Sequence, residues 1–384
     1  MSEALMSAYS DAVNDALERL DDLGYERNLG GGDLANHGPM AAEALAVLGH
    51  AAAIPDWVAV YRAAAPHHEP PVPYQRLGDD ESDWRAALGD IGRAGDFEEL
   101  FLRQISEEGW RAVLVRWWPR LLPGPMTGLT HGLIRTAHAV RGLSATDRPT
   151  PLQLGELARA LGYWAARFID APGPGRLTGK SGLAASIAAV PRLPGPKSPQ
   201  QAMARLRTPR SMPGYEESLT ALAPERADRL LSRMTAHFAG VCGAHAVGDF
   251  PIPLIHGVTA PAAARLVLPQ LPEGLYEPTL AAVWQAQVTL LMAATTDRSG
   301  EAEAPVQAQE ADPPPWDELI ARAVDHGDEH VIKFTEACLR ENALRPDPRY
   351  AWAVDRAQRM VERPDGPNGS AVTVRFGGGG ASRR

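Results

Sequence analysis

The chain has 384 residues, of which 45% are hydrophobic, and a formal net charge of −9 at pH 7. This length is sufficient for one large domain or two ordinary ones with a deep core. The sequence contains no basic stripe. Nucleic acid is therefore excluded as an expected partner, because phosphate binding needs a basic face.

Cysteine usage and the N-terminal sequence indicate a cytoplasmic protein. Cys242 and Cys338 are too few for a disulfide framework, and both are expected to be reduced core residues. Residues 1–20 carry several acidic side chains in place of a basic region followed by an apolar run, so no signal peptide is expected. The apolar stretch over residues 280–295 contains Gln285 and Gln287, and we do not expect it to span a membrane.

Apolar residues in the first third of the chain recur at helical spacing. Helices are expected over residues 5–23, 54–65, 84–88, 97–105 and 110–122. Between the first two, Asn36 is suited to cap a helix whose first turn contains Pro39. His37 then lies at a helix N-terminus, where the positive potential disfavours its protonated form and keeps the imidazole available as a ligand. His67 and His68, in a proline-rich loop, are expected to be surface residues.

The segment over residues 127–141 holds three ionisable side chains on an otherwise apolar helix. His131, Arg135 and His138 are separated by four and three residues, so they form one polar stripe. Such a stripe needs partners. It is expected either to face solvent or to line a polar site inside a helical bundle.

The rest of the chain continues the helical pattern. Helices are expected over residues 151–169, 183–190, 215–239 (one or two), 280–294, 316–344 and 350–361. His256 is expected just before another helix, with Thr259 as its cap. Residues 172–213 are expected to form a long connection, and the acidic, proline-rich residues 296–315 a solvated loop. The expected fold class is all-α, as a single large multi-helix domain over residues 1–363 with a central buried metal or substrate pocket, followed by a disordered tail over residues 364–384.

A polar edge marks the helix expected over residues 316–344. On one continuous helix His330 and Lys333 are neighbours, and His326 lies one turn before His330. Taken alone, the stretch is compatible with a solvated helix edge, in which Lys333 reaches water or pairs with Glu336.

Histidines placed at helix starts or on apolar helices suggest a metal site, because helical bundles project ligands inward from several helices. Imidazole-rich sites suit iron, copper, zinc or nickel. The carboxylate–histidine pattern of di-iron bundles is absent, as are His-Glu-x-x-His, Cys-x-x-Cys, the phosphate-binding loop and the Gly-x-Ser-x-Gly elbow. The histidines in question are His37, His131, His138, His256 and His330.

Four short segments, in this order and spacing, resemble the questin oxidase-like family, and the likeness spans about residues 30 to 360. The segments are Asn36-His37-Gly38-Pro39-Met40-Ala41, His131-Gly132-Leu133-Ile134, His256-Gly257-Val258-Thr259 and His330-Val331-Ile332-Lys333. The resemblance implies an α-helical oxygenase that uses O₂ to open a ring of an anthraquinone- or hydroquinone-type aromatic polyketide. It also implies a non-haem Fe²⁺ bound by His37, His131, His256 and His330, with Lys333 near the metal.

Carboxylation of the Lys333 amine would give an anionic oxygen ligand. Neutral imidazoles alone leave the charge of a ferrous ion uncompensated in an apolar pocket, and a carbamate supplies part of the missing negative charge. An unmodified Lys333 would be protonated and repelled by the metal. Where fungal-type members show a second histidine, this chain has Arg135, which is expected either to bind a phenolate or quinone oxygen or to pair with a carboxylate. His138 is expected to be a general base or a hydrogen-bond partner.

Alternatives within and outside the enzyme class remain open. One keeps the family but replaces ring cleavage by Baeyer–Villiger oxygen insertion with NADPH as an external reductant. The other is a metal-free helical carrier of aromatic metabolites. In each case the expected partner is a small aromatic molecule, and tryptophans are candidates to wall it or to form plain core. These are Trp117, Trp118, Trp164 and Trp284.

Overall fold

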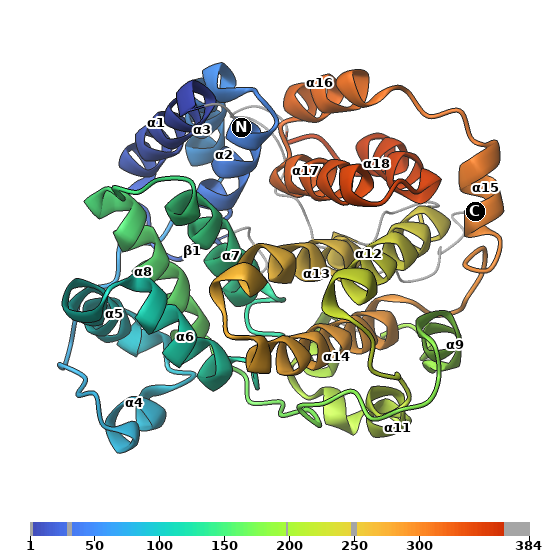
Figure 1. Ribbon diagram of the computed structural model, residues 1–384, viewed down its shortest axis with the longest axis horizontal. Helices are drawn as coiled ribbons and strands as arrows, with labels where there is room; N and C mark the ends of the chain where they lie inside the picture. Colours follow the sequence, from blue (N-terminus) through green and yellow to red (C-terminus); the bar gives the residue numbers. More distant parts are fainter. Residues whose placement is uncertain (1–2, 29–32, 197–198, 247–251, 365–384) are drawn as a thin grey trace, which may run out of the picture. The chain divides into compact units, whose positions relative to one another are not determined.

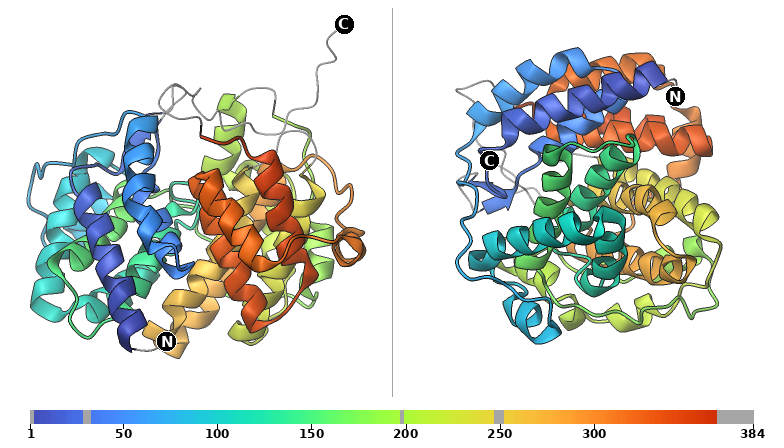
Figure 2. Two further views of the ribbon diagram at one scale, coloured as in Figure 1. Left: turned by 90° about the horizontal axis from the view of Figure 1, so that it is seen from above. Right: turned by 60° about the vertical axis from the view of Figure 1, so that its left-hand side comes forward.

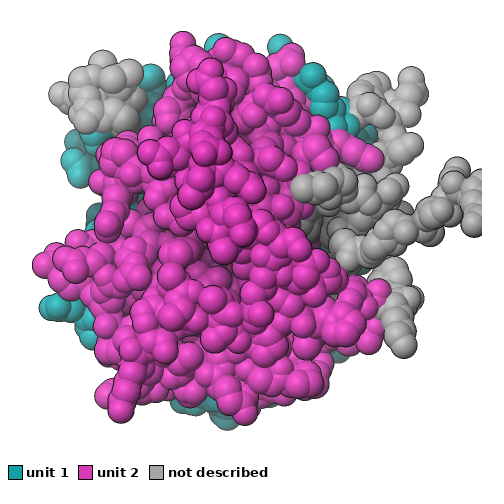
Figure 3. Space-filling model, turned by 90° about the vertical axis from the view of Figure 1, so that its right-hand side faces the viewer, with its two compact units in different colours: residues 1–170, 263–275, 363–373 teal, residues 171–262, 276–362, 374–384 magenta. Residues whose placement is uncertain are grey.

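The computed structural model describes residues 3–28, 33–196, 199–246 and 252–364. Within these ranges it contains 18 α-helices and one sheet of two strands, so the expected all-α class is confirmed (Figure 1). The chain divides into two compact units, drawn in different colours in Figure 3. Unit 1 comprises Met1–Asp170, Ala263–Leu275 and Arg363–Thr373, and unit 2 comprises Ala171–Ala262, Tyr276–Glu362 and Val374–Arg384.

Unit 1 is built mainly from the N-terminal helices. They are α1 (Glu3–Leu20), α2 (Gly38–Val47), α3 (Ile54–Ala64), α4 (Glu81–Ala87), α5 (Ala94–Glu108), α6 (Trp110–Leu121), α7 (His131–Ser144) and α8 (Pro151–Ala166). Helices α1, α2 and α3 pack side by side and are drawn in shades of blue in Figure 2. Helix α8 packs against both α5 and α7. Thr150 and Gln153 form a capping box at the start of α8, and Pro151 occupies the first helical position between them.

Unit 2 is built from the remaining helices. They are α9 (Leu183–Ala189), α10 (Pro199–Arg207), α11 (Tyr215–Leu219), α12 (Ala227–Ala244), α13 (His256–Val267), α14 (Tyr276–Ala294), α15 (Ala304–Glu310), α16 (Trp316–His326), α17 (Glu329–Leu344) and α18 (Pro348–Met360). Helix α18 packs against α12, α16 and α17. The last residues of α13, from Ala263 onward, are assigned to unit 1.

Short 3₁₀ helices precede or follow several of these elements. They are η1 (Ala51–Ala53), η2 (Ile91–Arg93), η3 (Pro209–Ser211), η4 (Ile252–Ile255), η5 (Leu268–Gln270) and η6 (Glu273–Leu275). Of these, η4 runs directly into α13, so the chain enters that helix at His256 without an intervening loop.

Several expected elements differ from those observed. A small antiparallel hairpin of β1 (Glu26–Asn28) and β2 (Asp33–Ala35) was not predicted, because three-residue strands are too short to show an alternating pattern. Helices α10 and α15 lie in segments expected to be a connection and a solvated loop, so both expectations were wrong in part. Thr259 lies inside α13 and donates to the Ile255 carbonyl, so it is not the cap of that helix.

The helix expected over residues 316–344 is two helices. Gly327 adopts a left-handed conformation with φ of 78° and ends α16, as glycine commonly does at a helix C-terminus. Asp328 then caps α17 by accepting hydrogen bonds from the backbone N–H groups of His330 and Val331. The expectation that His326 lies one turn before His330 on a continuous helix was therefore wrong.

One described stretch, Ile252–Gln270, is long and apolar enough to cross a membrane, but 78% of its most apolar window is buried inside the protein. Core helices pass the same test of length and composition. The last helix, α18, ends at Met360, close to residue 363, where the helical domain is expected to end. The tail expected to be disordered lies, from residue 365 on, outside the described residues.

Candidate metal centre

His37 precedes α2 as its N-cap and is 1% exposed. Its backbone N–H donates to the Tyr61 hydroxyl at 2.8 Å. That hydroxyl in turn donates to the side-chain oxygen of Asn36 at 3.0 Å, and the same oxygen accepts from the Gly38 N–H at 2.9 Å. Asn36 thus satisfies a donor at the helix start, as its type predicts, although it lies one residue before the N-cap. These contacts fix the backbone that carries the His37 ring.

His131 opens α7 after an unusual turn. Gly128, Leu129 and Thr130 all have positive φ, at 56°, 58° and 68°. A left-handed conformation is unfavourable for Leu and more so for the β-branched Thr, and such strain concentrates at functional sites. The turn directs the Gly128 carbonyl back to the His131 ring, where it accepts a hydrogen bond from Nδ1. Because a carbonyl only accepts, the proton of neutral His131 is on Nδ1, and Nε2 keeps its lone pair.

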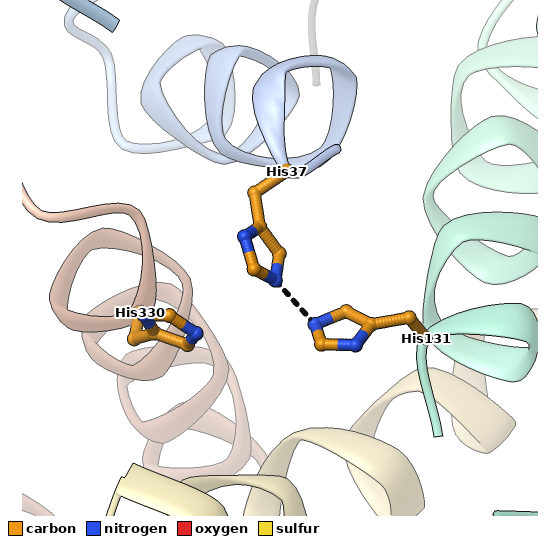
Figure 4. A group of neighbouring side chains, drawn as sticks. All are labelled: His37, His131 and His330. Carbon is orange, nitrogen blue, oxygen red and sulfur yellow. Dashed lines mark hydrogen bonds between the residues drawn. The ribbon is translucent and has the colours of Figure 1, made fainter. Parts of the chain in front are cut away.

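The two rings meet through their Nε2 atoms, which are 2.5 Å apart (Figure 4). The ring centroids are 4.3 Å apart and the planes are inclined by 59°. Both side chains are buried, and they come from helices α2 and α7, which pack against each other in unit 1. Two imidazole nitrogens that face each other in a buried place either share a proton or bind a common cation.

A glycine follows each of three candidate histidines, and each glycine is required by packing. A Cβ atom would lie 2.9 Å from the Leu20 side chain at Gly38, 2.5 Å from Trp164 at Gly132, and 1.9 Å from Phe238 at Gly257. Each helix therefore begins against a large apolar side chain, with only a hydrogen atom between them. The His-Gly sequence is thus a packing feature as well as a source of candidate ligands.

Arg135 and His138, the other members of the α7 stripe, have carboxylate partners. Arg135 is 3% exposed and donates from Nε and Nη2 to the two oxygens of Glu156, at 2.7 and 2.8 Å. Burial alone would lower the pKa of Arg135, but Glu156 outweighs burial and raises it, so the guanidinium stays charged. The third nitrogen, Nη1, is buried and donates to no partner among the described residues. The carboxylate pairing considered for Arg135 is therefore present, and one donor group is left over.

His138 donates from Nδ1 to Glu43 at 2.7 Å. Glu43 also accepts from Arg141, through Nε at 2.7 Å and through Nη2, and from the Tyr9 hydroxyl. Burial alone would raise the pKa of Glu43, but Arg141 and His138 outweigh it and hold the pKa at about 2. His138 thus has a hydrogen-bond partner in Glu43, and its expected role as a hydrogen-bond partner at the metal site stays a prediction. Its expected role as a general base stays a prediction.

His256 begins α13 in unit 2 and is 1% exposed. The carbonyl of the next residue, Gly257, accepts a hydrogen bond from the Gln287 amide of α14 at 2.8 Å. This bond ties the first turn of α13 to helix α14, which is buried from Thr279 to Ala293. It therefore fixes the position from which the His256 side chain leaves the backbone.

His330 lies in the first turn of α17, is 7% exposed and is surrounded by acidic groups of the same turn. Its Nδ1 is 3.5 Å from Asp328 and 4.0 Å from Glu329. Burial alone would raise the pKa of Asp328, but His330 and hydrogen bonds outweigh it and hold the pKa at about 2. The rings of His330 and His256 lie with centroids 6.2 Å apart in an edge-to-face arrangement. Asp328, Glu329 and His330 also form a group close enough to hold a metal ion.

Lys333 and His326 complete the predicted segment. Lys333 is 4% exposed, so the alternative in which it reaches solvent is wrong. Glu336, considered as its partner, forms an ion pair with Arg340 at 2.9 Å. His326 accepts from the Asp328 N–H and bonds the Val361 carbonyl at 3.0 Å, so both of its ring nitrogens serve the backbone. This agrees with the expectation that His326 is an outer group and His330 the ligand candidate.

The sequence did not single out Glu43, Glu156, Tyr61 and Asp328 as site residues. Glu43 carried a usable signal, because it is the one charged residue in the apolar segment Gly38–Val47. Asp328 carried another, as a cap residue directly before a buried histidine. His68 is exposed, as expected, and pairs with Asp33 at 2.8 Å, whereas His67 is only half-exposed.

The tryptophans considered as substrate walls are all at most 1% exposed. Their indole N–H groups have local partners: Trp117 donates to Gln104, Trp164 to the Gly124 carbonyl and Trp284 to the Ser218 carbonyl. Trp118 packs edge-to-face on Trp164. In the structure these four residues are packed core.

Comparison of the sequence with protein-family models gave no match, and comparison with proteins of curated function gave none. The resemblance to the questin oxidase-like family therefore rests on the four segments quoted above, and it stays a prediction.

The donor set in unit 1 fits a ferrous ion by its chemistry. Imidazole nitrogen is a preferred ligand of iron. Metal-binding histidines usually donate their second ring N–H to a backbone carbonyl or carboxylate, which fixes the tautomer. His131 has this arrangement through Gly128, and His37 presents the same ring nitrogen, Nε2, to it. The same set would also suit zinc or copper.

Proposed function

We propose that this protein is a non-haem iron-dependent oxygenase that cleaves a ring of an anthraquinone- or hydroquinone-type aromatic polyketide with O₂. The observation that carries the metal part is the buried meeting of His37 Nε2 and His131 Nε2 at 2.5 Å. The substrate class rests on the sequence resemblance alone.

In this proposal unit 1 supplies His37 and His131 as ligands. The ferrous ion, when bound, would bring O₂ and the ionised aromatic together and remove the spin barrier to their reaction. The chain's own part is orientation: the Tyr61 hydroxyl and Asn36 fix the His37 backbone, and the strained turn at Thr130 fixes His131. Burial of both rings keeps water from competing for the ligand nitrogens.

Arg135 is suited to bind an oxygen of the substrate. It lies one turn after His131 on the same helix, and its Nη1 is a buried donor without a described partner. Leaving a charged donor unsatisfied costs about 1–3 kcal/mol, so a phenolate or quinone oxygen at this nitrogen would recover that free energy. Glu156 holds the guanidinium in place through the other two nitrogens.

The remaining ligands proposed from the sequence, His256, His330 and Lys333, belong to unit 2. All three are buried, which suits ligands. Carboxylation of Lys333 is part of the proposal. A lysine amine reacts with CO₂ only in its neutral form, and burial of Lys333 favours that form. Mass spectrometry under native conditions tests it, through a mass increase that disappears in Lys333→Arg.

The function is tested by oxygen consumption with anthraquinone and hydroquinone substrates after anaerobic loading with Fe²⁺. We expect iron-dependent oxygen uptake in the wild type, at least ~10²-fold lower uptake in His131→Ala, and wild-type uptake in the surface control His68→Ala. Uptake only with NADPH would assign the Baeyer–Villiger alternative. Tight binding of aromatic molecules by a protein that takes up no iron would overturn the oxygenase and assign the carrier.

A further inference from the structure

A small cavity with a mixed apolar and polar lining lies in unit 1 beside the Glu43–His138 pair. Its volume is about 20 Å³. A cavity needs roughly 10–15 Å³ on this measure to hold one water molecule, so the space suits one water and little more. Its polar lining consists of Glu43, His138, Gln153 and Glu156, and all four side chains are more than nine-tenths buried.

These four groups come from three helices, and some of them can bond a water. Glu43 lies on α2, His138 on α7, and Gln153 and Glu156 on α8. An internal water typically makes about three hydrogen bonds to buried polar groups. Each Glu156 oxygen accepts one bond from Arg135 and can accept another, and the Gln153 amide, which donates one N–H to Ser10, has a second N–H to donate. The cavity therefore provides both an acceptor and a donor for a water.

The chemistry of His138 makes one of its nitrogens the site of proton exchange. Because Glu43 only accepts, the bond between them places a proton on Nδ1 of His138. His138 therefore gains or loses its second proton at Nε2. The charged groups around it are Glu43 of α2, Arg141 of α7 and Glu156 of α8, and the Tyr9 hydroxyl of α1 binds Glu43.

We propose that this cavity binds one internal water molecule and that His138 exchanges its Nε2 proton with that water. In one direction the Nε2–H bond of the imidazolium breaks, its proton bonds to the water oxygen, and the water releases one of its own protons to solvent. Neutral imidazole is left and no electron moves. His138 can then hold and release a proton two turns of α7 beyond His131. Glu43 is a positioning residue, because its bond keeps Nδ1 of His138 protonated.

Filling the cavity is a clean test, because Gly142 lines it and tolerates a methyl group. A Cβ at Gly142 would meet Val13 at 3.9 Å and the Tyr9 hydroxyl at 4.0 Å, which are ordinary contacts. Gly142→Ala therefore occupies part of the space without forcing a shift, and it should not lower Tm, because alanine favours the helix. Gly155→Ala on α8 is the matched control, since nothing lies within 4 Å of a Cβ there.

The first measurement is a high-resolution crystal structure of the metal-free protein and both variants. We expect a water in the cavity of the wild type and of Gly155→Ala, and none in Gly142→Ala. An empty cavity in the wild type would overturn the proposal.

The second measurement is a ¹⁵N NMR titration of the His138 ring in the metal-free protein, assigned through His138→Asn. We expect Nε2 to titrate while Nδ1 stays protonated. In Gly142→Ala the titration midpoint should fall by about 1–2 pH units. This is the free energy of one hydrogen bond to a charged group, about 1.5–3 kcal/mol, converted at 1.36 kcal/mol per pH unit. An unchanged midpoint, or titration at Nδ1, would contradict the proposal.

The bound water and the proton exchange at His138 do not depend on the proposed oxygenase function; only a use of this proton in catalysis rests on it. Both measurements omit metal and substrate, so their failure is distinct from a failure of that function.

Discussion

The two histidine pairs of this protein are built in different ways. In unit 1, His37 and His131 meet nitrogen to nitrogen, and their supporting groups are neutral: the Tyr61 hydroxyl and the Gly128 carbonyl. In unit 2, the rings of His256 and His330 are 6.2 Å apart between centroids, and acidic groups of the same turn lie beside His330.

The groups in unit 1 orient the histidine rings, whereas the groups in unit 2 place negative charge beside one. The Gly128 carbonyl fixes the His131 ring and its tautomer, and the Tyr61 hydroxyl fixes the backbone of His37; neither group carries a charge. A carboxylate beside the second ring nitrogen also raises the basicity of a histidine ligand and offers negative charge to a cation. Unit 1 therefore has the feature that predicts ligand geometry, and unit 2 has the feature that predicts charge compensation.

The largest expected effect is on the buried charges of unit 1. Glu43→Gln removes the anion shared by Arg141 and His138, and breaking such a buried group typically costs about 3–5 kcal/mol of unfolding free energy. Urea denaturation measures it. Asp15→Asn, which breaks an exposed pair with Arg19, is the control and should change stability by less than about 1 kcal/mol. Equal effects of the two variants would show that the Glu43 cluster is not a special part of unit 1.

Acidification should lower the unfolding free energy through Glu43 in unit 1 and through Asp328 in unit 2, by unequal amounts. The pKa is lowered from 4.5 to about 2 at Glu43 and from 3.8 to about 2 at Asp328. A lowered folded-state pKa gives stability that is present above the unfolded-state pKa and is lost as pH falls through the folded-state pKa. Between pH 5 and pH 2 the losses should be about 3 kcal/mol from Glu43 and about 2 kcal/mol from Asp328.

Denaturation curves over this pH range check the acid prediction. The pH dependence should become shallower in Glu43→Gln and, to a smaller extent, in Asp328→Asn. An Asp328 variant with the steeper change would reverse the order of the two regions.

The packing of the helix starts gives the next effect. Gly132→Ala places a Cβ 2.5 Å from Trp164, and Gly257→Ala places one 1.9 Å from Phe238. Overpacking of this kind costs about 1–3 kcal/mol, and the helix start that carries the histidine must move. Thermal unfolding should show both losses, while Gly155→Ala should not lose stability. A stable Gly132→Ala variant that binds iron normally would refute a positioning role for that glycine.

The smallest effect is expected at the strained turn before His131. Thr130→Gly relieves a φ of 68° in a β-branched residue, so the gain of about 1 kcal/mol offsets the entropy cost of glycine, and stability should change little. Thr136→Gly, inside α7, should instead lose about 1 kcal/mol or more. Chemical denaturation measures the unfolding free energy of the two variants. A large loss of stability in Thr130→Gly would mean that the turn is not strained.

Sequence periodicity predicted most of the helices because their apolar faces are long. It failed where the signal is local: the hairpin of β1 and β2, the short helices α10 and α15, and the break at Gly327. The break was predictable in principle, since Gly327 followed by Asp328 is a stop signal and a cap in succession.

The sequence correctly predicted that His37 lies at a helix start, because asparagine and proline mark that position. His131 was expected within a helical segment over residues 127–141 and His256 ahead of a helix capped by Thr259, whereas each is the first residue of its helix. It could not supply their partners. The contact of Glu43 with His138 joins residues 95 positions apart, and that of Arg135 with Glu156 joins two helices. Such pairings depend on how helices pack, which no short motif encodes.

The most direct test of the central claim, that His37 and His131 bind the metal, is an anaerobic Fe²⁺ titration of the untagged protein followed by calorimetry. We expect one iron per chain in the wild type and in His68→Ala. We expect affinity at least ~10²-fold weaker in His37→Ala and in His131→Ala, because each removes a ligand. Wild-type affinity in either of these two variants would contradict the claim.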